Sequence, residues 1–332
     1  MPERALATNV TRLQLSEVVH RDTAMPKVMG RWGRPPATAL LASLCCLIRG
    51  PIASEHATSS PEQQLATSTV GKGTPVVIVT GMLGSAYGFR KVIPRLVADS
   101  FRVTVVDPLG FGASPRPDNA DYSFTAQADR VARTIDALGG GPVILVCHAL
   151  AGTICLRLAY RRPDLVRGIV SINGGASEQA GTTEMRFALK FARVVLFFAG
   201  RSFAVRKVKQ GLIESSGDTT WVADSVVDRY VGAFGTDARQ IVRSLEHIVA
   251  SHDSEPLRPN LGRVTAPVLL LFGPTTRNPK NPTVASEERV LLRSALRRFE
   301  EEDVAGAGEY IQEEQPARVV AAISRMRDET RR

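Results

Sequence analysis

The stretch that decides the fold is Pro142-Val143-Ile144-Leu145-Val146-Cys147-His148-Ala149-Leu150-Ala151-Gly152, near the middle of the 332-residue chain. Its first five residues are apolar and mostly β-branched, which predicts a short buried strand. Small residues follow at once, and a helical pattern then runs from Thr153 to Tyr160. The sequence therefore predicts a strand, a sharp turn and a helix in immediate succession.

Similar units flank this stretch. Two apolar runs precede it, Pro75-Val76-Val77-Ile78-Val79 and Phe101 to Val106, and each ends in a glycine-containing loop. Gly168 to Asn173 and Pro267 to Phe272 have the pattern of two later strands, which are closed by Gly174-Gly175 and Gly273. Strands that alternate with helices predict a parallel sheet with both faces covered.

From about Thr74 to Ser324, the order and spacing of these segments resemble the α/β-hydrolase fold family. The turn around Ala149 is similar to the nucleophile elbow, G-x-S-x-G, of that family. The resemblance implies the α/β class, with a doubly wound, mostly parallel sheet and a helical cap insertion. It places the core at residues 74–175 and 262–330, and the cap at residues 176–261.

Enzymes of this family use a serine, an acid and a histidine in that chain order. By resemblance, the nucleophile position is Ala149, the acid position is Thr276 and the histidine position is Glu309. A methyl group cannot attack a carbonyl, a threonine carries no charge, and a carboxyl group is no imidazole. The sequence therefore predicts a degenerate triad, as in a hydrolase-like pseudoenzyme. Hydrolysis through a rearranged triad ranks last among the hypotheses.

The chain has five histidines, and none lies in its last eighty residues. We expect His148, beside the elbow, to be structural and to line the pocket with Gly81. His247 and His252 are expected at the surface or at a helix end. Cys147 could be considered as a replacement nucleophile, but a buried structural thiol is the better interpretation.

Glu309 is the one substitution that leaves a reactive group behind. A carboxyl group in an apolar pocket has a raised pKa and can act as a general acid or base. The backbone N–H groups of Met82 and Leu150 would still form an oxyanion hole. Together they would support a lyase, isomerase or cyclase reaction. The neighbouring Glu313 and Glu314 favour instead a Glu309 that faces solvent in a drifted loop.

The cap segment is rich in apolar residues. Phe187 to Ala199 has the spacing of a helix with a wide apolar face, and Trp221 to Phe234 and Ala238 to Ala250 read as two further helices. By resemblance the cap sets ligand preference, and its composition favours a small apolar molecule. A lid, a membrane-facing patch and a protein partner remain alternatives.

The first 54 residues read as a leader. After Met25 come basic residues, an apolar run from Ala37 to Ile48 and a small-residue exit at Ile52-Ala53-Ser54, a pattern similar to a secretory signal peptide. The apolar run is too short for a stable membrane span. We expect a secreted or periplasmic protein if the signal functions, and a cytoplasmic one otherwise. Residues 55–73 read as a linker.

The formal charge of +9 is partly due to the leader, which holds seven Lys/Arg and three Asp/Glu residues. The remaining arginines are scattered without interleaved aromatic residues, so we expect no nucleic-acid partner. Two of the four cysteines lie in the leader, and no disulfide framework is implied. No motif calls for a metal or a cofactor.

Overall fold

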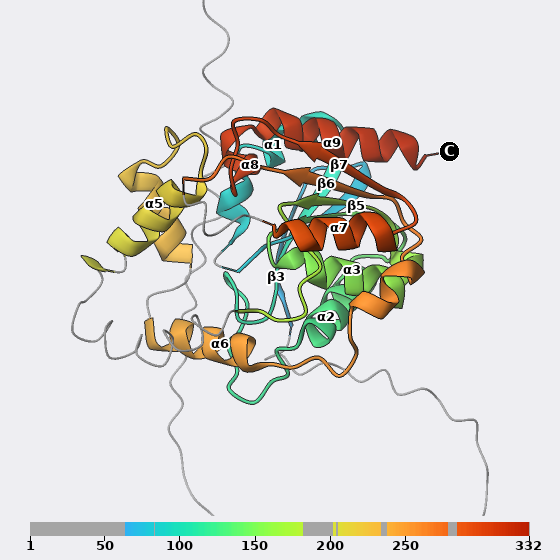
Figure 1. The fold of residues 1–332 in the computed structure, drawn as a ribbon, viewed down its shortest axis with the longest axis horizontal. Helices are drawn as coiled ribbons and strands as arrows, with labels where there is room; N and C mark the ends of the chain where they lie inside the picture. The colour runs from blue at the N-terminus through green and yellow to red at the C-terminus, as the bar shows by residue number, and fades with distance from the viewer. Residues whose placement is uncertain are drawn as a thin grey trace, which may run out of the picture. The chain divides into compact units, whose positions relative to one another are not determined.

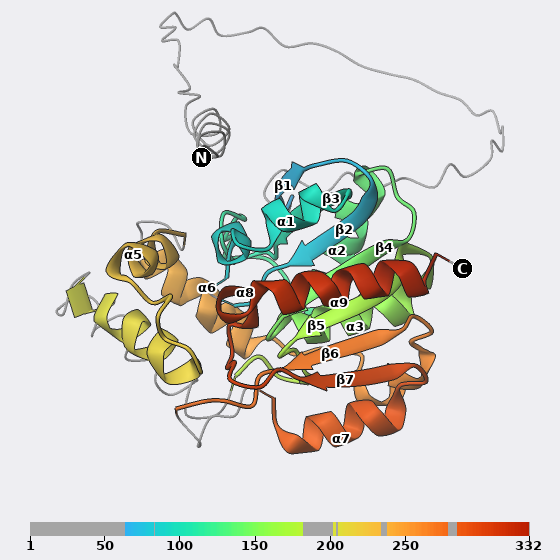
Figure 2. The same cartoon turned by 90° about the horizontal axis from the view of Figure 1, so that it is seen from above.

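The computed structural model describes residues 64–82, 84–181, 202–203, 205–233, 238–277 and 284–331. Within these ranges, seven strands form one sheet in the order β1-β3-β2-β4-β5-β6-β7 (Figures 1 and 2). β1 pairs antiparallel with β3, and the other neighbouring pairs are parallel. The strands are β1 (Ala66–Val70), β2 (Thr74–Val79), β3 (Phe101–Asp107), β4 (Val143–His148), β5 (Val166–Ile172), β6 (Val268–Phe272) and β7 (Phe299–Asp303).

Helices cover both faces of this sheet, as Figure 2 shows. α1 (Ile93–Ala98) and α9 (Pro316–Glu329) lie on one face, where Val319 packs in one core cluster with Val76 and Ile78. α2 (Phe124–Ala137), α3 (Ala151–Arg161) and α7 (Ser286–Ala295) lie on the other, where Ile154 packs with Val77. The alternation of side chains along β2 therefore supplies both cores. The predicted α/β fold class is confirmed.

β1 corrects the expectation that residues 55–73 are a linker, because Ala66–Val70 is a strand. Four of its five side chains are exposed, and Thr69 hydrogen-bonds the hydroxyl of Thr104 on β3 at 2.9 Å. A strand at the edge of a sheet can be polar on its exposed side, so it lacks the apolar pattern that marks a buried strand.

β7 was not expected from the sequence, because Phe299-Glu300-Glu301-Glu302-Asp303 is mostly acidic. Its carboxylates meet arginines on the helices to either side. Such exposed pairs contribute about 0–1 kcal/mol each, but together they offset the repulsion between neighbouring acids. The pairs are Arg293–Glu301 at 2.8 Å, Arg318–Glu302 at 2.9 Å and Arg325–Glu300 at 3.1 Å, with Arg289 also bound to Glu301.

The cap lies at the carboxyl edge of the strands and includes α5 (Asp224–Ala233) and α6 (Ala238–Ala250), and residues 205–215 are helical (Figure 1). The bounds of α6 match the expected helix, whereas α5 is shorter than the expected Trp221 to Phe234. Phe187 to Ala199 and the leader lie outside the described residues. Among the helices that the structure describes, none is long and apolar enough to cross a membrane.

A buried arginine joins both ends of the cap to the core. Arg157 on α3 is fully buried, and its guanidinium lies 3.1 Å from Glu178, near the start of the cap. The same group lies 3.5 Å from Asp253 and donates to the carbonyl of Glu255 at 2.6 Å, near the end of the cap. The two stems of the insertion are therefore held at one point on α3.

Candidate functional site

The turn after β4 keeps the geometry of an elbow. Ala149 has a φ of 50°, in the left-handed region that few non-glycine residues adopt. Its N–H donates to the carbonyl of Ile172 at 2.9 Å, and its carbonyl accepts from the N–H of Gly152 at 2.9 Å. A Cβ at Gly152 would lie 2.7 Å from the Cα of Gly174, so only glycine fits there. The elbow therefore presents a methyl group in a strained turn that its neighbours hold in place.

His148 precedes the elbow and is buried. Its Nε2 lies 3.0 Å from the carbonyl oxygen of Glu309, which can only accept a hydrogen bond, so Nε2 carries the proton. Burial lowers the pKa of His148 to about 4, partly offset by this hydrogen bond. The ring is therefore neutral near pH 7. A Cβ at Gly81 would lie 2.6 Å from the carbonyl oxygen of His148, so these two expected pocket residues are packed against each other.

Glu309 lies against His148 rather than facing solvent. Its side chain is 17% exposed, and its Oε1 is 3.5 Å from Nε2 of His148. Burial raises the pKa of Glu309 well above its ordinary value, and the charge of Glu314 raises it further. The solvent-facing Glu309 that the neighbouring acids favoured is therefore wrong. Burial therefore disfavours the charged form of both groups at this contact.

The main chain of Glu309 is held on both sides. Its N–H donates to the carbonyl of Ser215, in the cap, at 2.7 Å. Its carbonyl oxygen accepts from His148 and also from Nδ2 of Asn173 at 3.1 Å. The cap and the end of β5 therefore fix where this residue lies.

Of the acidic neighbours of Glu309, Glu313 is buried and Glu314 is partly buried, so the run is not a solvated face. The Glu313 side chain is fully buried beside Arg90, 3.4 Å from Lys91, and accepts from the hydroxyl of Tyr230 on α5 at 3.0 Å. Glu314 accepts the N–H groups of Gly217, Asp218 and Gly308 at 2.9, 2.9 and 3.1 Å. These two carboxyl groups tie the cap to the loop after β7.

Thr276 and the expected oxyanion donors lie at the same edge of the sheet. Thr276 is half-buried, and its hydroxyl donates to the carbonyl of Glu214 at the end of the cap helix at 3.2 Å. Leu150 precedes the first turn of α3, and Met82 lies in the loop after β2, the strand next to β4. The two backbone N–H groups come from adjacent loops, and their role as an oxyanion hole stays a prediction.

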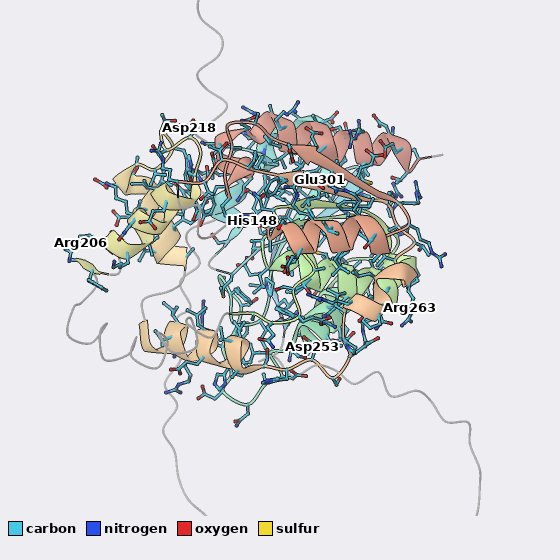
Figure 3. The ribbon with its side chains drawn as sticks, in the orientation of Figure 1. His148, Arg206, Asp218, Asp253, Arg263 and Glu301 are labelled. Atoms are coloured by element: carbon cyan, nitrogen blue, oxygen red, sulfur yellow. The ribbon has the colours of Figure 1, made fainter. Side chains whose placement is uncertain are left out.

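The remaining candidates are two cysteines and two histidines. Cys147 and Cys155 are free and fully buried, and burial and the neighbouring Cys147 raise the pKa of the Cys155 thiol. His247 on α6 stacks on Tyr122 with ring centres 5.6 Å apart, and His252 is exposed. Among the described residues, no group of three or more metal-ligating side chains is placed to hold an ion. Figure 3 shows His148 on the side of the core that carries the cap helices.

Residues 74–211 match the sequence model of a family described as the alpha/beta hydrolase fold. This chain has the α/β-hydrolase fold. A haloalkane dehalogenase of Psychrobacter cryohalolentis is 25% identical over 260 residues, which cover 75% of this chain and 82% of that protein. An uncharacterised hydrolase, YugF, of Bacillus subtilis is 24% identical over 202 residues, covering 61% and 72%.

Solved structures agree on the fold. A thermophilic esterase from Thermogutta terrifontis superposes with a TM-score of 0.63 at 20% identity, covering 80% of this chain and 93% of that one. A bromoperoxidase from Bacillus anthracis superposes with a TM-score of 0.64 at 17% identity, covering 80% of this chain and 95% of that one. At such identities the likeness establishes the fold alone.

In an α/β-hydrolase fold, the triad comes from loops at the carboxyl ends of the strands. Here these loops follow β4, β6 and β7 and carry Ala149, Thr276 and Glu309. The loops after β6 and β7 are joined to one short cap segment, residues 214–218, through the carbonyls of Glu214 and Ser215. Sequence reasoning missed this junction and also Asn173, because their partners are remote in the chain.

Proposed function

We propose that this protein is a non-hydrolytic member of the α/β-hydrolase fold that binds a small apolar molecule at the carboxyl edge of its sheet, beneath the cap. The observation that carries the proposal is Ala149. Its backbone has the left-handed φ of an elbow, but its side chain has no atom that could attack a carbonyl. A covalent mechanism at this position is chemically impossible.

The other two triad positions support the proposal. The Thr276 hydroxyl donates to the carbonyl of Glu214, and no threonine can carry the charge that stabilises an imidazolium. Glu309 occupies the histidine position with a carboxyl group whose pKa is raised by burial. One replacement would be compatible with a variant mechanism, whereas three together favour the loss of hydrolysis.

A fluorophosphonate probe tests the loss of hydrolysis directly, since it labels activated serines. We expect no labelling of the full chain and no turnover of a panel of p-nitrophenyl esters above the buffer rate. Labelling of any serine, mapped by mass spectrometry, would overturn the proposal. Ligand binding is tested separately by thermal shift with a panel of small apolar molecules. A panel without a single stabilising compound would count against the binding role.

A second candidate is an enzyme of altered chemistry, in which Glu309 transfers a proton in a lyase, isomerase or cyclase reaction. The specific observation in its favour is the burial of the Glu309 carboxyl against His148, with a raised pKa. Glu309→Gln keeps the shape of the side chain and removes its titrating proton. On a compound found by the binding screen, this change should abolish turnover, whereas the exposed control Glu287→Gln on α7 should not. Equal turnover in both variants would exclude this candidate.

A further inference from the structure

Asn173 follows β5 directly and lies at the centre of the candidate site's scaffold. It is 1% exposed and has a φ of 50°, a left-handed conformation that asparagine tolerates better than most residues. Its backbone N–H donates to the carbonyl of Leu271 on β6 at 2.9 Å. The backbone of Asn173 is therefore anchored to the neighbouring strand.

The side-chain amide of Asn173 joins the loops after β6 and β7. Its Oδ1 accepts from the N–H of Gly273 at 2.8 Å. Its Nδ2 donates to the carbonyl oxygens of Gly308 at 2.9 Å and Glu309 at 3.1 Å. The amide thus spans from the end of β6 to the residue at the histidine position of the triad.

The carbonyl of Glu309 receives a second hydrogen bond, from Nε2 of His148 at 3.0 Å. Asn173 and His148 therefore share the carbonyl oxygen of Glu309 as acceptor, and the N–H of Glu309 donates to the carbonyl of Ser215. With its main chain held at both ends, the Glu309 carboxyl is kept 3.5 Å from His148. Of these contacts, only those of Asn173 also reach the loop after β6.

The chemistry of the position requires an amide. A side chain here must accept from one N–H and donate to two carbonyl oxygens, which asparagine does with one oxygen and one NH2 group. An ionised aspartate has no donor and would face two carbonyl oxygens with its charge.

We propose that Asn173 is the positioning residue of this site, which fixes the loop after β7 so that the Glu309 carboxyl stays against His148 and out of water. This inference deepens the second candidate function and rests on it. Asn173 acts through Glu309, not on a ligand. The other titratable groups near the Glu309 carboxyl are Tyr310 and Glu314. Tyr310 directly precedes the short helix α8 (Ile311–Glu314), and Glu314 is its last residue.

The test uses Asn173→Gly, because glycine accepts a positive φ and the change removes the side chain, and with it the amide, without straining the backbone. The readout is the titration of the Glu309 carboxyl, followed by carbon-13 NMR of glutamate-labelled full-length protein and assigned with Glu309→Gln. We expect the midpoint to fall toward the ordinary glutamate range by about one pH unit or more, as water reaches the freed loop. The matched control is Asn260→Gly, which removes an exposed amide bonded to the carbonyl of Pro256 at 2.9 Å. Its Glu309 midpoint should match the parent.

A folded Asn173→Gly variant with an unchanged Glu309 midpoint would overturn the inference. If that variant does not fold, the parent protein itself supplies the measurement. The two side-chain amide protons of Asn173 should then exchange slowly with solvent, and a rapidly exchanging pair would equally overturn it. The titration needs no ligand, so it is independent of the binding screen. If Asn173→Gly shifts the Glu309 midpoint but the binding screen finds no compound, this inference stands and the proposed binding function fails.

Discussion

At the elbow, a methyl group occupies the place of the family's reactive oxygen, while the backbone keeps its strained conformation. A left-handed φ at a non-glycine residue costs on the order of 1 kcal/mol and persists only where the surroundings impose it. Here the surroundings are the carbonyl of Ile172, bound by the N–H of Ala149, and the close packing of Gly152 on Gly174. Packing therefore maintains the left-handed φ at position 149 although no nucleophile stands there.

Restoring the hydroxyl by itself should not restore hydrolysis. In Ala149→Ser the new oxygen would lack the imidazole that normally takes its proton, because the histidine position holds the carboxyl group of Glu309. We expect p-nitrophenyl ester turnover to stay within about twofold of the parent and of an Ala149→Gly control. Substantial esterase activity in the serine variant alone would mean that a base lies within reach of position 149.

Glu309 should make the protein less stable as the pH rises. Its folded pKa lies above the unfolded value of about 4.5, so its stabilising contribution is complete below that pH and is lost as the pH increases through the folded pKa. His148 acts in the opposite sense, since its folded pKa of about 4 lies below its unfolded 6.5 and its contribution is lost as the pH falls between these values.

The Glu309 contribution can be isolated by urea unfolding of the parent and Glu309→Gln from pH 4 to 8. The variant should gain stability relative to the parent as the pH rises above about 4.5, because glutamine does not titrate. The His148 contribution is common to both proteins and cancels to first order. A difference in unfolding free energy that is independent of pH would contradict the burial of this carboxyl.

Among the elements, α3 connects the site to the cap. Its first residues follow the elbow, and its buried Arg157 contacts Glu178 and the segment around Asp253, which are the two stems of the cap insertion. A buried arginine with several carboxylate and carbonyl partners is costly to desolvate, but removing it leaves carboxylates without their partner. The helix therefore begins at the elbow and also contacts both stems of the cap.

Arg157→Leu should destabilise the protein by about 3–5 kcal/mol, because the buried partners lose their counter-charge. Arg161→Leu is the matched control on the same helix, since Arg161 is a third exposed and makes exposed pairs with Asp129 at 3.0 Å and Glu255 at 2.7 Å. Its cost should be about 0–1 kcal/mol. Urea midpoints measure both, and equal losses would show that Arg157 is not the junction of the two stems.

At the scale of the molecule, the cap and the sheet are joined by buried and partly buried polar contacts of Glu313, Glu314 and Arg157. We expect residues 57–332, which form one compact unit, to unfold in a single transition. The chain has two tryptophans, so in a Trp32→Phe variant the fluorescence comes from Trp221 and reports on the cap. Far-UV circular dichroism reports on the secondary structure of the whole protein. The two melting curves should coincide, and an earlier loss of Trp221 fluorescence would show that the cap melts alone.

Local residue patterns were sufficient for most of the core. The runs at β2 to β6 are short and apolar, and their order with glycine-containing loops predicts the doubly wound sheet. The loss of the nucleophile at Ala149 is also visible in the sequence, since it depends only on which residue stands at the elbow. β1 and β7 were not predicted because edge strands need no apolar outer face. The acids of β7 pair with arginines on helices that are remote in the chain.

The sequence by itself determined the fold class and the absence of a serine at the elbow, because both depend on residue type and order along the chain. Only the tertiary structure decided the state of Glu309. Its burial, its contact with His148 and its attachment to Ser215 and Asn173 bring together residues from four separate segments. The pKa of a carboxyl group depends on water and charge within a few ångströms, and folding alone sets those surroundings.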